Sequence, residues 1–183
     1  MPSLQEAQRR MDGAVEALRR EFTGVRTGKA TPALLDTVRV EAYGAHVPLN
    51  QVASVSAPEA RMLLVQPWDR AMMGPVEKAI LSSDLGLNPA NDGKVIRVPI
   101  PALTEERRRE YARILHKMTE EARIMVRQAR KDANDDIKRR QKDGDLSEDE
   151  AHREQDEVQK LTDRYIHQLE ELLKHKEAEV MEV

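Results

Sequence analysis

The stretch TEERRREYARILHKMTEEARIMVRQARKDANDDIKRRQK, residues 104–142, decides the fold of this chain because it carries one uninterrupted helical pattern. Its apolar residues recur at intervals of three and four, which is the spacing of one face of an α-helix. They are Tyr111, Leu115, Met118, Ala122, Met125, Ala129 and Ala133. Thr104 with Glu105 behind it is typical of a helix N-terminus, and Asp143-Gly144 ends the pattern. A helix this polar buries only a narrow stripe and therefore needs partner helices.

The two ends of the chain carry matching helical patterns. Near the N-terminus an apolar stripe recurs every seven residues, at Leu4, Met11, Leu18 and Val25. Ser147 and Glu150 form a capping-box pair, which predicts the start of a third helix. Its stripe comprises Ala151, Gln155, Val158, Leu161, Tyr165, Leu169 and Leu172. None of these helices can bury its apolar face alone, so we predict a three-helix bundle formed by residues 1–29 and 104–183.

The helix lengths predict that the bundle is uneven. The first helix is shorter than the other two and is expected to run out near the level of Asp132 to Asp136. Beyond that level the second and third helices should continue as a two-helix tip that ends at Asp143-Gly144.

Residues 30–103 have a different character. Short alternating segments predict strands, and Val76, Ala79 and Ile80 predict one face of a short helix. The strand segments are 37–43, 47–49, 52–56, 62–66 and 94–98, and the helix is 75–83. We therefore predict the α+β class: an elongated three-helix bundle with an inserted small α/β domain, rich in β-strand, over residues 30–103. The two connections are predicted to act as a hinge formed by Gly28, Lys29, Pro32, Pro99 and Pro101.

Composition limits the classes of function. The chain has 34% charged and 3% aromatic residues and contains no cysteine, which excludes disulfides and thiolate chemistry. No segment is apolar enough for a signal peptide or a membrane span, so we expect a cytoplasmic protein without membrane contact. We also expect it to be a monomer. The net charge of −3 conceals an uneven distribution. Residues 105–146 hold 13 basic and 10 acidic side chains, whereas residues 147–183 hold 5 and 12.

The residues that would carry catalysis are not arranged for it. Residues 23–30, TGVRTGKA, superficially look like a phosphate-binding loop, but the spacing is one residue short and Ala30 replaces the required Ser or Thr. A helix terminus is the favoured interpretation. The five histidines show no metal-ligand spacing, and the serines lack a nucleophile context. We expect no enzymatic activity, no cofactor and no metal.

One positional signal concerns binding. Arg123, Arg127, Arg130 and Asn134 lie at i, i+4, i+7 and i+11, so they share one strip of the long helix. Arg109 and His116 extend this strip toward the hinge, while acidic residues fall on the opposite flank. Positive charge along one edge of a helix can follow a phosphate backbone. The alternative is an ordinary solvated edge whose arginines pair with the acidic third helix.

Several stretches taken together resemble the ribosome recycling factor family along essentially the whole chain. They are Val25–Asp36 (VRTGKATPALLD), Val47–Ala53 (VPLNQVA), Ser83–Pro89 (SDLGLNP), Asn91–Gly93 (NDG), Ile96–Pro99 (IRVP), Leu103–Arg108 (LTEERR), Val126–Asn134 (VRQARKDAN) and Asp156–Asp163 (DEVQKLTD). The resemblance implies an L-shaped molecule of roughly tRNA-like dimensions, with a three-helix bundle and a hinged α/β domain.

The resemblance also implies a function in protein biosynthesis. The protein would bind the post-termination ribosome between its subunits, with the bundle against large-subunit rRNA. Elongation factor G would push the hinged domain and promote subunit splitting, and initiation factor 3 would act downstream. The resemblance places rRNA contact on Arg127 and Arg130, followed by Lys131 and Asn134, while Arg123 and Arg109 come from the strip itself.

A second class of function is a coiled-coil or helical adaptor that binds a partner helix and no RNA. Such an adaptor explains the heptads equally well. It does not explain a proline-bounded inserted domain or a basic strip on one edge.

Overall fold

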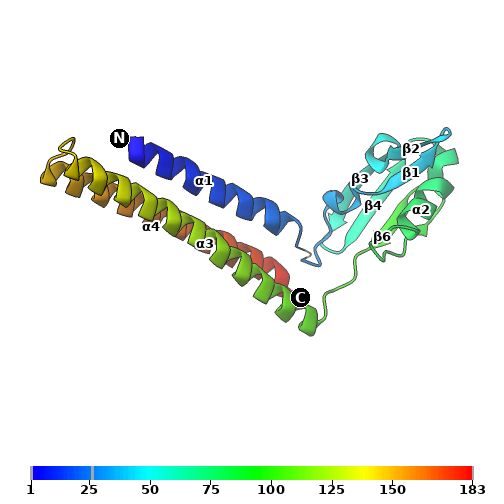
Figure 1. The fold of residues 1–183 in the computed structure, drawn as a ribbon. Coiled ribbons are helices and arrows are strands. Elements are labelled where there is room, and N and C mark those ends of the chain that lie inside the picture. Colours follow the sequence, from blue (N-terminus) through cyan, green and yellow to red (C-terminus); the bar gives the residue numbers. More distant parts are fainter. Residues whose placement is uncertain (1, 26, 183) are drawn as a thin grey trace. The chain divides into compact units, whose positions relative to one another are not determined.

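The computed structural model describes residues 2–25 and 27–182, and its chain divides into two compact units (Figure 1). One unit comprises the chain up to Thr27 together with Glu105–Glu182, and the other runs from Gly28 to Thr104. Arg26, which belongs to the first stretch of the family resemblance, lies outside the described residues.

The first unit is a bundle of three helices. They are α1 (Pro2–Thr23), α3 (Glu105–Lys142) and α4 (Glu148–Met181). Each helix contributes an apolar stripe to a shared core, with Met11 and Leu18 from α1, Leu115 from α3 and Leu169 from α4 almost completely buried. Burying these stripes against one another removes apolar surface from water, which is what stabilises helices of this polarity.

The α3 stripe departs from the sequence prediction most clearly at Met125. Met125 was predicted to be buried, but it is 50% exposed, and Val126 is completely buried instead. Ala122, Val126, Ala129 and Ala133 continue the buried face at intervals of three and four. Because an α-helix has 3.6 residues per turn, both Met125 and Val126 fit this spacing beside Ala122, and the packing of the partner helices decides between them.

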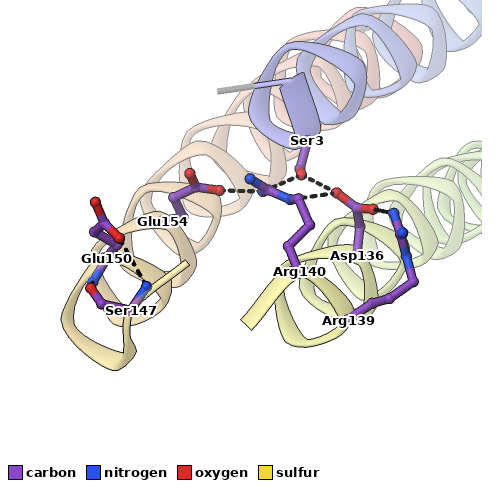
Figure 2. A network of polar contacts seen from close by, with 7 residues as sticks. All are labelled: Ser3, Asp136, Arg139, Arg140, Ser147, Glu150 and Glu154. Atoms are coloured by element: carbon purple, nitrogen blue, oxygen red, sulfur yellow. Dashed lines mark hydrogen bonds and ion pairs between the residues drawn. The ribbon is translucent and has the colours of Figure 1, made fainter. Parts of the chain in front are cut away.

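The turn between α3 and α4 follows the predicted signals. Gly144 adopts φ +85°, and the Asp145 N–H donates to the Arg140 carbonyl at 2.9 Å. Ser147 then caps α4: its Oγ accepts from the Glu150 N–H at 3.2 Å, and its own N–H donates to Glu150 Oε2 at 2.8 Å (Figure 2). The capping box predicted from the sequence is therefore confirmed.

A polar network joins all three helices near this turn. Arg140 of α3 donates to Asp136 Oδ2 at 3.1 Å, to Ser3 Oγ of α1 at 2.7 Å and to Glu154 Oε2 of α4 at 2.5 Å (Figure 2). The Ser3 hydroxyl also donates to Asp136 at 2.5 Å. We call Ser3, Asp136, Arg140 and Glu154 the Arg140 cluster. It places the start of α1 level with Asp136, so the predicted two-helix tip beyond that level is confirmed (Figure 1).

The second unit is built from two antiparallel sheets and a short helix. Its strands are β1 (Arg39–Ala42), β2 (Ala45–Pro48), β3 (Ala53–Glu59), β4 (Met62–Pro67), β5 (Ala90–Asn91) and β6 (Ile96–Pro99), and its α-helix is α2 (Met73–Leu81). Strands β1 and β2 form a hairpin, while the larger sheet has the order β3-β4-β6-β5. The hairpin turns at Tyr43 and Gly44, whose φ angles of 52° and 80° suit the right-handed twist of the strands.

The core of this unit lies among the strands, α2 and the segment before β1. Leu63 and Val65 of β4, Ile96 and Val98 of β6, and Ile80 of α2 are completely buried. The alternation along β6, buried at Ile96 and Val98 and exposed at Arg97, is the period-two pattern from which the strand was predicted. The segment predicted as a strand at 47–49 differs, because β2 ends at Pro48 and the short 3₁₀ helix Leu49–Gln51 follows it.

Candidate nucleic-acid interface

The predicted basic residues lie along one flank of α3. We call Arg109, His116, Arg123, Arg127, Arg130, Lys131 and Asn134, together with Lys138 on the same flank, the α3 basic strip. Arg130 NH1 lies 3.5 Å from Gln159 Oε1 and His116 Nε2 lies 2.9 Å from Glu177 Oε1, so the strip borders α4. On the opposite flank, Asp132 accepts from Arg10 of α1 at 2.6 Å. The bundle therefore separates a basic edge of α3 beside α4 from a more acidic edge beside α1.

Three arginines of the strip pair with carboxylates of α3 itself. Arg123 and Arg127 both donate to Glu120, at 3.0 Å and 3.2 Å, and Arg109 donates to Glu105 at 2.5 Å. The solvated-edge hypothesis expected these arginines to pair with acidic α4. Within the described part of the chain, the contact from the strip to a carboxylate of α4 is the hydrogen bond between His116 and Glu177.

The end of the strip nearer the tip makes no short ion pair. No ion pair among residues 2–25 and 27–182 involves Arg130, Lys131 or Lys138, and Lys131 and Lys138 are exposed. Arg130 is half-buried beside the uncharged amide of Gln159. Cationic side chains without a carboxylate partner are the ones best able to meet phosphate groups. This end of the strip is thus the strongest candidate for contact with a nucleic-acid backbone.

Asn134 differs from its neighbours in the strip. Its residue is half-buried, and its Oδ1 atom is buried without a hydrogen-bond partner among the described residues. A buried polar atom usually has a partner, because leaving it unpaired is costly. Asn134 is therefore held against the bundle more closely than Lys131 and offers less surface to another molecule.

Glu120 and Ile124 belong to the same surface and were not predicted. Ile124 is 57% exposed, an unusual position for an isoleucine, and it precedes Arg127 by one helical turn and Lys131 by two. Glu120 lies one turn before Arg123. Both positions follow from the helical spacing of residues 104–142, but neither residue carries the positive charge by which the strip was predicted.

The structure also places the predicted hinge residues. Gly28 adopts φ +74°, and a Cβ at this position would lie 3.4 Å from the Leu103 side chain, so the two connections lie next to each other. Pro32 opens a 3₁₀ helix (Pro32–Leu35), and Pro99 is the last residue of β6, paired with Met62. Lys29 and Pro101 lie outside helices and strands.

Both connections are tied to one turn of the second unit. The Ala30 N–H donates to the Ala60 carbonyl at 2.7 Å, and the Ile100 N–H donates to the Arg61 carbonyl at 2.8 Å. Ala60 and Arg61 form the turn between β3 and β4. These two hydrogen bonds therefore fix both connections to the same β3–β4 turn.

Two further findings concern membrane-spanning helices and clusters of metal ligands among the described residues. No helix there is long and apolar enough to cross a membrane. Nor do histidine and carboxylate side chains of these residues gather into a group that could hold a metal ion.

The fold and the strip together define a class: a helical bundle with a basic edge and a small inserted β-rich unit. The model of the ribosome recycling factor family matches residues 18–181. The chain is 54% identical over 180 residues to a ribosome-recycling factor of Symbiobacterium thermophilum, covering 98% of this chain and 97% of the relative. It is 55% identical, with the same coverage, to one of Carboxydothermus hydrogenoformans. The chain belongs to the ribosome recycling factor family, as its sequence motifs predicted.

Solved structures agree with this assignment. A solution structure of a ribosome recycling factor matches with a TM-score of 0.73 and 44% identity, covering 100% of this chain and 97% of the other. A second match, with a TM-score of 0.63, 45% identity and coverage of 99% and 98%, comes from models for the T. thermophilus ribosome recycling factor and the E. coli elongation factor G bound to the E. coli post-termination complex. The predicted α+β class, with a three-helix bundle and a small antiparallel β unit, is confirmed.

Proposed function

We propose that this protein recycles ribosomes after termination. It binds the post-termination ribosome between its subunits and, together with elongation factor G, promotes subunit splitting. Family membership supports this proposal, as does the similarity to a ribosome recycling factor described together with elongation factor G on a post-termination complex. The same evidence argues against an adaptor that binds no RNA.

The α3 basic strip is the proposed contact with large-subunit rRNA. Arg127 and Arg130 are its principal members, Lys131 and Asn134 extend it, and Arg123 and Arg109 complete it. The observation that carries this assignment is the absence of any short ion pair to Arg130 and Lys131 among the described residues. Such cations neutralise phosphates and release counterions, which drives association with RNA.

The second unit would supply the mechanical part of the function. Elongation factor G would act on this unit with its own GTP hydrolysis, and the connections with Gly28, Lys29, Pro32, Pro99 and Pro101 would transmit the movement. The protein itself would act in the cytoplasm as a monomer, without catalysis or a cofactor. Initiation factor 3 would then keep the separated subunits apart.

The test uses purified bacterial ribosomes and the whole 183-residue chain. Binding is measured by co-sedimentation, and splitting is measured by light scattering after addition of elongation factor G and GTP. The proposed function requires co-sedimentation, and splitting that depends on both factors. A chain that stays in the supernatant at low salt, or binds without accelerating splitting, would contradict the proposal and favour the adaptor.

A further inference from the structure

A carboxylate lies inside the α3 basic strip. The two oxygens of Glu120 accept from different arginines, Oε2 from Arg123 NH1 at 3.0 Å and Oε1 from Arg127 NH1 at 3.2 Å. These arginines follow Glu120 by three and seven residues, so all three side chains share one face of α3. Two guanidinium groups from successive turns thus converge on a single anion.

The three side chains differ in how firmly they are held. The Arg123 side chain is only 19% exposed, because it packs against the bundle. The Arg127 and Glu120 side chains are 52% and 49% exposed. The Arg123 side chain is therefore held in place by packing, whereas the Glu120 side chain can rotate into solvent without disturbing the core. Another anion could therefore replace the Glu120 carboxylate between the two arginines.

A phosphate group meets the same requirements as this carboxylate. Both present several acceptor oxygens to guanidinium donors, and hydrogen bonds between charged groups are stronger than those between neutral ones. The hydrogen bond from Arg123 lowers the pKa of the Glu120 carboxyl, and the positive charge of Arg127 adds to this effect. In the free protein Glu120 is thus an anion at neutral pH, and it competes with any phosphate for the same donors.

We propose that Arg123 and Arg127 form a subsite for one phosphate group of the RNA backbone, and that Glu120 occupies this subsite until RNA displaces it. The inference rests on the proposed function, because it assigns an internal anion to a strip already proposed to bind rRNA. In this proposal Glu120 weakens RNA binding, because its ion pairs with Arg123 and Arg127 must break before a phosphate can bind there.

The decisive comparison is Glu120→Gln against Glu121→Gln. Both changes remove one negative charge from adjacent positions of α3, but Glu121 is exposed on the other flank and makes no ion pair among the described residues. We expect Glu120→Gln to tighten binding to purified bacterial large ribosomal subunits about two- to fivefold, the range typical of an exposed ion pair, and Glu121→Gln to change it much less. Circular dichroism of both variants checks that α3 stays helical.

A double-mutant cycle assigns the effect to the subsite. In an Arg127→Ala background, Glu120→Gln should lose most of its benefit, because one of the two donors that Glu120 blocks is then gone. Equal tightening by Glu120→Gln and Glu121→Gln would reduce the effect to net charge. Weaker binding by Glu120→Gln would mean that the carboxylate positions the arginines. Either result overturns the inference.

A second readout needs no ribosome. Inorganic tripolyphosphate is titrated into protein carrying ¹³C-labelled glutamate, and the Glu120 carboxyl is followed by NMR as a function of pH. Displacement by phosphate should raise the pKa of Glu120 toward its ordinary value, while the signal of Glu121 serves as the internal control. If Glu120 responds but the chain does not bind large subunits, the subsite stands and the proposed function falls. An unchanged Glu120 with normal subunit binding rejects the subsite alone.

Discussion

The hydroxyl of Tyr165 on α4 donates a hydrogen bond to the carboxylate of Asp12 on α1, and this bond joins the two helices at the edge of the bundle core. Burial, followed by the hydrogen bond to Asp12, raises the pKa of Tyr165 to about 12. The ordinary value for tyrosine is about 10. The folded protein therefore holds this proton more tightly than the unfolded chain does.

The shifted pKa predicts a window of alkaline sensitivity. The stabilisation linked to the Tyr165 proton is complete below about pH 10 and is lost as the pH rises toward about 12, because the unfolded chain releases the proton first. Spectrophotometric titration at the tyrosinate band should show a late ionisation step that disappears in Tyr165→Phe. In denaturant unfolding, the advantage of wild type over Tyr165→Phe should shrink across this window. Equal pH dependence of the two proteins would contradict the assignment.

Removing Arg140 should destabilise the bundle strongly. Arg140→Met keeps the length of the side chain but leaves Asp136 and the buried Glu154 without their shared cation. We expect a loss of about 2–4 kcal/mol in the free energy of unfolding, somewhat below the cost of breaking a fully buried pair. Arg139→Met is the matched control, because Arg139 is exposed and its ion pair among the described residues is with Asp136; about 1 kcal/mol or less is expected. Urea unfolding of both variants gives the comparison, and similar losses would refute a special role for the cluster.

Arg130→Ala should weaken ribosome binding without affecting stability. The side chain makes no ion pair within the described part of the chain, so its truncation should leave the thermal midpoint nearly unchanged. Loss of one phosphate contact should reduce the salt dependence of binding by about 0.7–0.9 in the slope of log K against log salt. Arg19→Ala on α1 removes the same charge away from the strip and should bind like wild type. If Arg130→Ala keeps the wild-type affinity at two salt concentrations, the strip is a solvated edge.

Pro101→Gly should separate binding from splitting. Pro101 follows the Ile100–Arg61 anchor and lies outside β6, so replacing it leaves the second unit intact while freeing the backbone of the connection. We expect near-normal co-sedimentation with ribosomes and slower splitting with elongation factor G, because a looser connection transmits less of the movement. Binding and splitting measured on one preparation decide the matter. Parallel loss of both would assign Pro101 to folding, and unchanged splitting would make the stiffness of the connection irrelevant.

Helix termini and strand alternation were the features that the sequence predicted best. The capping box of Ser147 and Glu150, and the alternation around Ile96 and Val98, are local patterns with a direct physical cause. The choice of Val126 over Met125 was not predictable in this way, because both residues fit the helical period and the partner helices decide which one is buried. The two-residue strand β5 was missed because it is too short to show a period.

In the basic strip, too, the features set by local spacing were predictable and those set by side-chain conformation were not. Helical spacing placed Arg123, Arg127 and Arg130 on one flank, since that depends only on the 3.6-residue repeat. The bridging of Arg123 and Arg127 by Glu120 depends on side-chain conformations, which spacing does not fix. The anchoring of Ala30 to Ala60 and of Ile100 to Arg61 joins backbone groups far apart in sequence, and such bonds leave no local signal.

Gly28 and Leu103 lie so close together that a Cβ on Gly28 would be 3.4 Å from the Leu103 side chain, so the inserted unit begins and ends at nearly the same place. A segment with adjacent ends and a core of its own can be closed into a ring or spliced into a foreign host loop without stretching its strands. We therefore expect residues 28–104 to fold when moved into another host chain, and a backbone-cyclised version to need only a short bridging peptide. The same geometry explains how such a unit can interrupt a helical bundle, since its insertion requires only a narrow gap in the host chain.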